Sequence, residues 1–144
     1  MTDIRANTSE DPQSAGTAIL GGGPPSLAPG PELMAAHALR GDPVVNPKGY
    51  ALGRIEHIVV DVQRGRIAYA VLTFGGFLGL GEKYFAIPWN ALTFDADRHR
   101  FILNVDRAVL EGAPGFDRNH WPAMADPEWA SHLHAYYGFP PYWG

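Results

Sequence analysis

The sequence contains no cysteine, and only two of its 11 basic residues are lysines, Lys48 and Lys83. The absence of cysteine excludes disulfides, thiolate catalysis and cysteine-ligated zinc or iron–sulfur sites. The net charge is about −4, because 15 acidic residues outnumber the basic ones. A general nucleic-acid binder gains its affinity from neutralised phosphates, so we do not expect nucleic acid to be a partner.

Long apolar runs are also missing. No stretch approaches the roughly 18 residues that a membrane-spanning helix needs. The first 30 residues lack the basic start and the apolar centre of a secretory signal peptide. We therefore expect a chain without a membrane span, located in the cytoplasm of a bacterium-like cell.

Three segments of different composition follow one another. Residues 1–31 are rich in Gly, Pro, Ser, Ala and Thr, and the apolar pair Ile19–Leu20 stands alone there, which indicates a disordered leader. Residues 32–110 contain alternating apolar runs separated by glycine turns, as in a small β domain. Residues 111–144 form a C-terminal extension. The length fits one folded domain with flanking segments.

The segment 49–89 organises the domain, since its alternating runs follow one another without a helix-length insertion. Residues 66–74 alternate with period two and predict the central strand of an antiparallel meander. In the preceding run, residues 51–62, the apolar side chains change from an odd position, Ile55, to even positions from Ile58 on. A β-bulge near Glu56–His57 would keep them on one face. That bulge would direct one set of side chains inward: Ile55, Ile58, Val60 and Val62.

Turn signals divide the domain into six strands. Gly65 suits a hairpin turn with a left-handed residue, and a second hairpin is predicted across residues 96–99. The predicted strands are 44–46, 51–62, 66–74, 84–89, 92–95 and 101–105. Bent strands of this number and length predict a small six-stranded antiparallel β-barrel, closed and filled by side chains.

Helices are predicted near residues 32–39, 106–110 and 126–137. The last has the clearest start and stop signals, with Asp126 as N-cap, Pro127 in the first turn and Gly138 after the end. Trp129, Leu133 and Tyr136 or Tyr137 then form an apolar stripe. The aromatic end, residues 139–143, either clamps across its own barrel or docks on a second copy, and we expect the second copy.

Several motifs together resemble the PRC-barrel family, which includes a domain of the photosynthetic reaction centre H subunit and of a bacterial ribosome maturation factor. The motifs are Val44–Asn46, Gly49-x-x-Leu52-Gly53-x-Ile55, Asp61-x-x-x-Gly65–Tyr69, Phe74–Gly79 and Phe85–Trp89. The segments around 113–117, 121–122 and 124–129 resemble the extension of a stand-alone bacterial subgroup. The resemblance implies a six-stranded barrel that serves as a docking module without known catalysis.

The glycine-rich loop 75–83 superficially resembles a phosphate cradle. A phosphate-binding loop needs a following helix whose amides face the phosphate, whereas a strand is predicted here. We instead expect the glycines to shape a tight loop. The apolar side chains of Phe77, Leu78 and Leu80 would then form a contact surface for a partner.

Six histidines raise the question of a metal site. His132 and His134 are two positions apart on a predicted helix, so their side chains diverge. A site would have to combine His120 with Asp117 or Asp126. In the simpler interpretation Asp126 caps a helix, Asp117 lies in a turn and His120 is a surface residue. We predict no metal and no cofactor.

Catalytic groups are similarly few. Asp61 and Glu56 lie on one predicted strand near Arg64 and Arg66, and opposite charges placed so usually form cross-strand ion pairs. Three of the four serines lie in the predicted leader. The residues therefore do not indicate an enzyme.

Together these patterns predict a non-catalytic PRC-barrel protein that binds a protein partner and forms a homodimer. Its expected contact residues are Phe77, Leu78, Leu80, Tyr142 and Trp143. One alternative is a hydrolytic or small-ligand-binding enzyme that uses the barrel mouth. Another is an accessory factor of photosynthetic electron transfer, or of RNA or ribosome assembly. The RNA role would require a basic face built by Arg54, Arg64, Arg66, Arg98 and Arg100.

Overall fold

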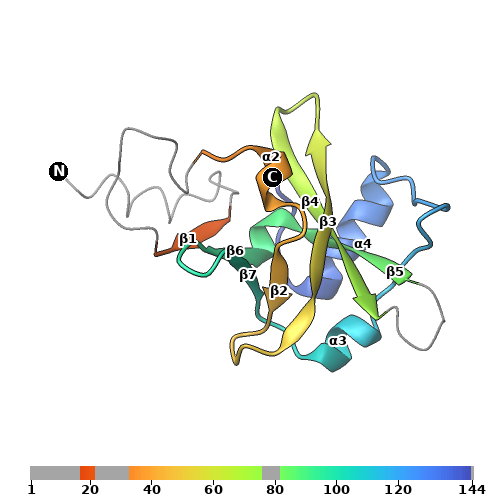
Figure 1. Ribbon diagram of the computed structural model, residues 1–144. Helices are drawn as coiled ribbons and strands as arrows, with labels where there is room; N and C mark the ends of the chain where they lie inside the picture. Colours follow the sequence, from red (N-terminus) through yellow and green to blue (C-terminus); the bar gives the residue numbers. More distant parts are fainter. Residues whose placement is uncertain (1–16, 22–32, 76–81, 144) are drawn as a thin grey trace.

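The computed structural model describes residues 17–21, 33–75 and 82–143 (Figure 1). Its strands are β1 (Ala18–Leu20), β2 (Pro43–Val45), β3 (Ala51–Asp61), β4 (Arg66–Gly75), β5 (Glu82–Pro88), β6 (Leu92–Asp95) and β7 (Arg100–Leu103). The helices are α2 (Ala36–Leu39), the 3-10 turn η1 (Trp89–Ala91), α3 (Arg107–Glu111) and α4 (Pro127–Tyr137).

The meander β3–β4–β5 confirms the predicted centre of the domain. β4 pairs antiparallel with β3 on one side and with β5 on the other. Gly65 has the positive φ of 69° that the hairpin turn requires. The register of β3 on β4 shifts between Ile55 and His57, so the predicted bulge is also confirmed.

The bulge does not keep all the predicted side chains inward. Ile55 is fully buried, whereas the exposed fraction is 51% at Val60 and 88% at Val62. A second register shift lies between Val59 and Val60, and β3 ends at Asp61, one residue before Val62. The prediction for Val60 and Val62 is therefore wrong, because a one-residue shift reverses which face a side chain occupies.

The β class is confirmed, but the topology differs from the predicted antiparallel barrel. The described strands form one seven-stranded sheet in the order β1-β6-β7-β2-β3-β4-β5. Two of the pairs, β1 with β6 and β2 with β7, are parallel. The order ends at β1 and β5, so the described strands form an open mixed sheet. Both strands of the β6–β7 hairpin take part in a parallel pair. β7 lies parallel to β2, and β6 lies parallel to β1.

β1 lies within the predicted disordered leader. Its three residues pair with β6, the amide of Ala96 donates to the carbonyl of Leu20 at 2.8 Å, and the hydroxyl of Thr17 donates to the carbonyl of Trp89 at 2.7 Å. The isolated apolar pair in the leader thus extends the sheet. The remainder of residues 1–32 lies outside the described part of the chain, so the prediction for it stays a prediction.

The C-terminal extension covers the other end of the sheet. Phe116 and Tyr84 of β5 exchange two backbone hydrogen bonds, both 2.9 Å long. Gly115 permits this approach, since a Cβ there would lie 2.9 Å from the ring of Phe85. In Figure 1 α4 lies beside the β4–β5 part of the sheet, and β1, β6 and β7 form the opposite end.

Helix α4 has the predicted residues at its start and at its end. The side chain of Asp126 accepts a hydrogen bond from the amide of Glu128, Pro127 opens the helix, and Gly138 ends it with a φ of 77°. Its buried face carries Ala130, Leu133, His134 and Tyr137. Tyr136 is exposed, so Tyr137 completes the apolar stripe. The helix predicted near residues 32–39 is shorter, since α2 has only the four residues Ala36–Leu39.

Candidate binding site

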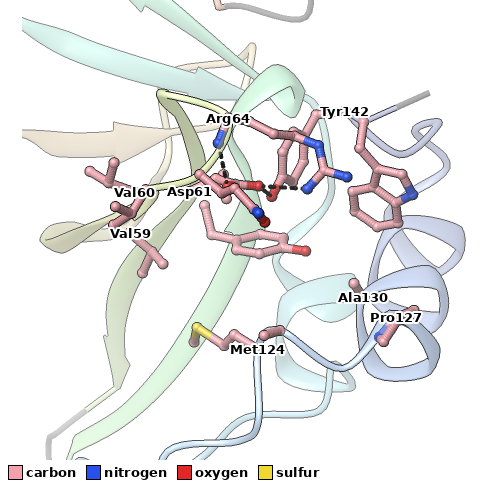
Figure 2. A pocket seen from close by; sticks show the side chains of 14 residues that line it. Val59, Val60, Asp61, Arg64, Met124, Pro127, Ala130 and Tyr142 are labelled. Atoms are coloured by element: carbon pink, nitrogen blue, oxygen red, sulfur yellow. Dashed lines mark hydrogen bonds and ion pairs between the residues drawn. The ribbon is translucent and has the colours of Figure 1, made fainter.

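A cavity of about 500 Å³ lies between the end of the β3–β4 hairpin, the start of α4 and the C-terminal tail. Figure 2 shows side chains from these three segments around one space. Most of the lining is apolar. The lining residues are Val59, Val60, Asp61, Val62, Gln63, Arg64, Ala68, Tyr69, Met124, Ala125, Pro127, Ala130, Tyr142 and Trp143.

Asp61 shapes the hairpin wall of the cavity. It ends β3, and its Oδ1 accepts a hydrogen bond from the amide of Arg64 at 2.9 Å. Its carbonyl accepts another from the amide of Gly65 at 2.8 Å. Asp is common in such turns because its short side chain bonds to a backbone amide nearby. The turn therefore holds the Asp61 carboxylate at the rim.

The C-terminal tail, residues 139–143, forms the opposite wall. The left-handed Gly138 turns the chain back after α4, and the amide of Phe139 donates to the carbonyl of His134 at 3.0 Å. Arg66 of β4 donates to the carbonyl of Tyr142 at 3.3 Å. These bonds bring the aromatic end of the chain onto its own sheet.

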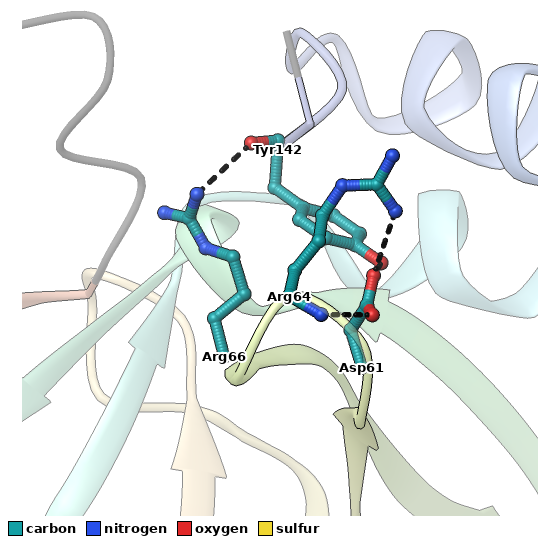
Figure 3. A network of polar contacts seen from close by, with 4 residues as sticks. All are labelled: Asp61, Arg64, Arg66 and Tyr142. Atoms are coloured by element: carbon teal, nitrogen blue, oxygen red, sulfur yellow. Dashed lines mark hydrogen bonds and ion pairs between the residues drawn. The ribbon is translucent and has the colours of Figure 1, made fainter.

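A polar network joins the two walls (Figure 3). The phenol of Tyr142 donates to Oδ2 of Asp61, and an Nη of Arg64 lies 3.1 Å from the same oxygen. The bond from Tyr142 and those from Arg64 lower the pKa of Asp61 to about 2. Burial and the bond to Asp61 raise the pKa of Tyr142 to about 12. Asp61 is thus ionised and Tyr142 neutral at physiological pH.

Tyr69 of β4 lies deeper in the lining. It is only 2% exposed, and its ring packs at 5.5 Å from Trp129 and at 6.2 Å from Tyr142, measured between ring centroids. Its hydroxyl is buried and has no hydrogen-bond partner among the described residues. Burial raises the pKa of Tyr69, so the phenol keeps its proton.

His134 lies behind the tail. It is 1% exposed, its Nδ1 lies 2.9 Å from the carbonyl of Ala130, and its ring packs at 5.3 Å from that of Trp143. Its Nε2 has no partner in the described part of the chain. Burial lowers the pKa of His134, so the imidazole is neutral near pH 7. His132 is exposed, which confirms that the two histidines diverge.

The structure places two of the five predicted contact residues at this cavity. Tyr142 and Trp143 line it, and both are partly buried. Phe77, Leu78 and Leu80 lie outside the described residues. Nothing in the sequence marked Tyr69 as a site residue, because apolar alternation assigns it only to a strand.

The alternative metal site does not assemble. Nδ1 of His120 lies 3.5 Å from Asp117, and both side chains are largely exposed. Asp126 caps α4, as the simpler interpretation predicted. Within the described residues no three His, Asp or Glu side chains come close enough to hold a metal ion.

The predicted charge pairs are also rearranged. Asp61 pairs with Arg64 inside the turn, and Glu56 pairs with Arg40 at 3.3 Å. The other arginines proposed for a basic face bond to groups of the chain itself: Arg54 to the carbonyl of Gly41, Arg66 to that of Tyr142, and Arg98 and Arg100 to Asp95. These bonds occupy some of the N–H donors of the arginines, so fewer donors remain for a phosphate.

A protein-family model described as a PRC-barrel domain matches residues 31–110, more than half of the chain. The match contains β2 to β7, whereas β1, α4 and the tail lie outside it. A comparison with curated proteins found no match. In the described segments no helix is long and apolar enough to cross a membrane.

Proposed function

The chain belongs to the PRC-barrel family, and from this we propose that it is a non-catalytic binding module that assembles with a second copy of itself. The PRC-barrel domain is not a known catalytic family. The cytoplasmic location expected from the sequence is part of this proposal.

The chemistry of the cavity rim supports a binding role. An acid–base catalyst works best with a pKa near the working pH. The pKa of Asp61 is about 2 and that of Tyr142 about 12, so neither exchanges protons readily near pH 7. Their hydrogen bond instead fixes the tail on the hairpin.

The observation that carries the proposal is an exposed apolar surface at the end of the hairpin. Val60 and Val62 are 51% and 88% exposed, and both border the cavity together with Tyr142 and Trp143. We call these four residues the hairpin–tail surface. Clustered apolar side chains on a soluble domain mark contact sites.

A second copy is the occupant that fits best. Identical apolar patches can cover each other around a twofold axis, which is the commonest arrangement of homo-oligomers. A β domain of this size buries a limited core, so it gains stability from additional burial. Phe77, Leu78 and Leu80 of the glycine loop are proposed to extend the contact surface.

Sedimentation velocity tests the proposal. The wild-type protein is expected to sediment as a dimer, and the double variant Val60→Lys, Val62→Lys as a monomer, because charges would face each other across the axis. Tyr50→Lys is the matched control, since Tyr50 is 67% exposed but does not line the cavity. A monomeric wild type, or a double variant that remains dimeric, would contradict self-association.

A second experiment addresses the glycine loop and other protein partners. Affinity capture with the wild type is compared with the double variant Phe77→Ala, Leu78→Ala. Loss of a specifically captured protein in the variant would support a contact role for the loop. Equal capture by both proteins would remove the loop from the proposed surface.

A further inference from the structure

We propose that the cavity between the hairpin, α4 and the tail binds a small apolar molecule whose carbonyl or carboxylate oxygen accepts a hydrogen bond from the hydroxyl of Tyr69. This inference concerns the cavity alone and does not depend on self-association.

The size and lining of the cavity fit such a ligand. Its volume of about 500 Å³ falls within the range of roughly 300–1,000 Å³ typical of small-molecule sites. Val59, Met124, Ala130 and Trp143 supply apolar and aromatic surface from three separate segments. Sites of this kind combine an apolar wall with a few polar groups that fix orientation.

The Tyr69 hydroxyl is the polar group that points to a ligand. A buried hydroxyl without a hydrogen bond is costly, and buried polar groups are normally paired. Tyr69 lines the cavity, and its hydroxyl has no partner in the described segments. The phenol remains protonated because burial raises its pKa. It is therefore available as a donor.

The remaining polar groups favour an acceptor over a cationic group. The Asp61 carboxylate already accepts from Tyr142 and from two groups of Arg64. The Arg64 side chain is 51% exposed and lines the cavity, so part of its guanidinium is still open to an oxygen. A ligand oxygen would thus meet donors and positive charge.

The tail is the element that must adjust for entry. The Tyr69 hydroxyl is covered in the structure, and Tyr142 packs on the Tyr69 ring. The tail backbone is held near this point by the 3.3 Å bond from Arg66 and the 3.4 Å bond from Asn90 to the carbonyl of Pro140. Both bonds are long and therefore weak. The Tyr142 side chain is held more firmly by its bond to Asp61, so exposure of the Tyr69 hydroxyl requires that bond to break or Asp61 to move with the tail.

Three probes of similar shape test the proposal, each a naphthalene with one branched substituent of three heavy atoms: 2-acetylnaphthalene, 2-naphthoate and 2-isopropylnaphthalene. Only the last lacks an acceptor. Titrations followed by NMR of the labelled full-length protein should show the ketone or the carboxylate binding more tightly than the hydrocarbon. One hydrogen bond corresponds to an affinity gain of about three- to tenfold. The two oxygenated probes distinguish a neutral from an anionic ligand.

The variant Tyr69→Phe should reduce this preference while leaving the melting temperature unchanged or higher, since no protein hydrogen bond is lost. Tyr137→Phe is the control, because the Tyr137 hydroxyl is also buried and unpaired among the described residues but lies outside the cavity lining. That variant should keep the preference.

Three results would overturn the proposal. They are the absence of shifts in cavity residues with any probe, equal affinities of the three probes for the wild type, and a preference that is undiminished in Tyr69→Phe. Sedimentation of the same samples reports self-association separately, so failure of one proposal does not hide the outcome of the other.

Discussion

The phenol of Tyr142 donates a hydrogen bond to the carboxylate of Asp61, although 81 positions separate the two residues. The bond fixes the end of the chain on the turn that joins β3 and β4. It links the PRC-barrel domain to an extension outside the family match, and it stands at the rim of the cavity.

Loss of this bond should loosen the tail. In Tyr142→Phe the hydroxyl that donates this bond is missing, and Asp61 keeps only its bonds from Arg64. We expect faster removal of C-terminal residues by carboxypeptidase, with little change in the melting temperature. Tyr50→Phe, at an exposed site, is the control and should behave as the wild type. Equal digestion rates of wild type and Tyr142→Phe would contradict the assigned role.

Acid should destabilise the protein through His134. Its folded pKa lies below the ordinary value of 6.5 because of burial, so the unfolded chain binds the proton more readily. The free energy of unfolding therefore decreases as the pH falls from about 7 through the folded pKa. Chemical denaturation at a series of pH values measures this slope.

Two variants assign the slope to one residue. His134→Leu should flatten the pH dependence between about 7 and 5, whereas His132→Leu, at an exposed position of the same helix, should preserve it. An unchanged slope in His134→Leu would show that other groups cause the acid response.

Gly53 is expected to tolerate no side chain. Its φ is 153°, and a Cβ there would lie 2.2 Å from the carbonyl oxygen of Thr73 on the neighbouring strand. Gly53→Ala should reduce the free energy of unfolding by about 3 kcal/mol. Gly49→Ala meets no atom within 4 Å at a φ of 89° and should cost only about 1–2 kcal/mol. Urea titration compares the two, and similar losses would show that the close approach is not important.

Removal of residues 1–21 should weaken the β6 edge of the sheet. β1 pairs along β6, and the deletion exposes the backbone groups of Thr93 to Asp95 that face it. Unpaired edges promote association between chains. We expect a lower melting temperature and more light scattering on heating. Removal of residues 1–16 alone keeps β1 and should have a smaller effect. Equal behaviour of both truncations would argue against a role for β1.

Local structure was well predicted where one short stretch determines it. The alternation in residues 66–74 gave β4, Gly65 gave the hairpin, and Asp126 with Gly138 gave the bounds of α4. These features depend on side-chain period and on backbone conformations that only certain residues favour.

The sheet order was not predictable in the same way. Apolar and polar residues alternate in the same way whether a strand is parallel or antiparallel to its neighbour. This alternation therefore does not identify the neighbour of β2. The pair Ile19–Leu20 is too short to show a period. The second shift in β3, between Val59 and Val60, has no glycine or proline to indicate it, and it decides the exposure of Val60.

The binding site was predicted in part. Tyr142 and Trp143 stood out because aromatic side chains near a chain end need a surface to cover. Their target on the chain, beside Asp61 and Tyr69, depends on the path of the backbone after Gly138. The sequence alone does not give that path.

The two parallel pairings also constrain the order in which the protein folds. The contacts of β3, β4 and β5 join neighbouring segments, so this meander can form early. Ala18 must wait for Thr93, and Val44 for Phe101, and such distant contacts slow folding. During synthesis, β1 therefore leaves the ribosome long before its partner strand exists, and the sheet reaches its full width only when most of the chain has been made.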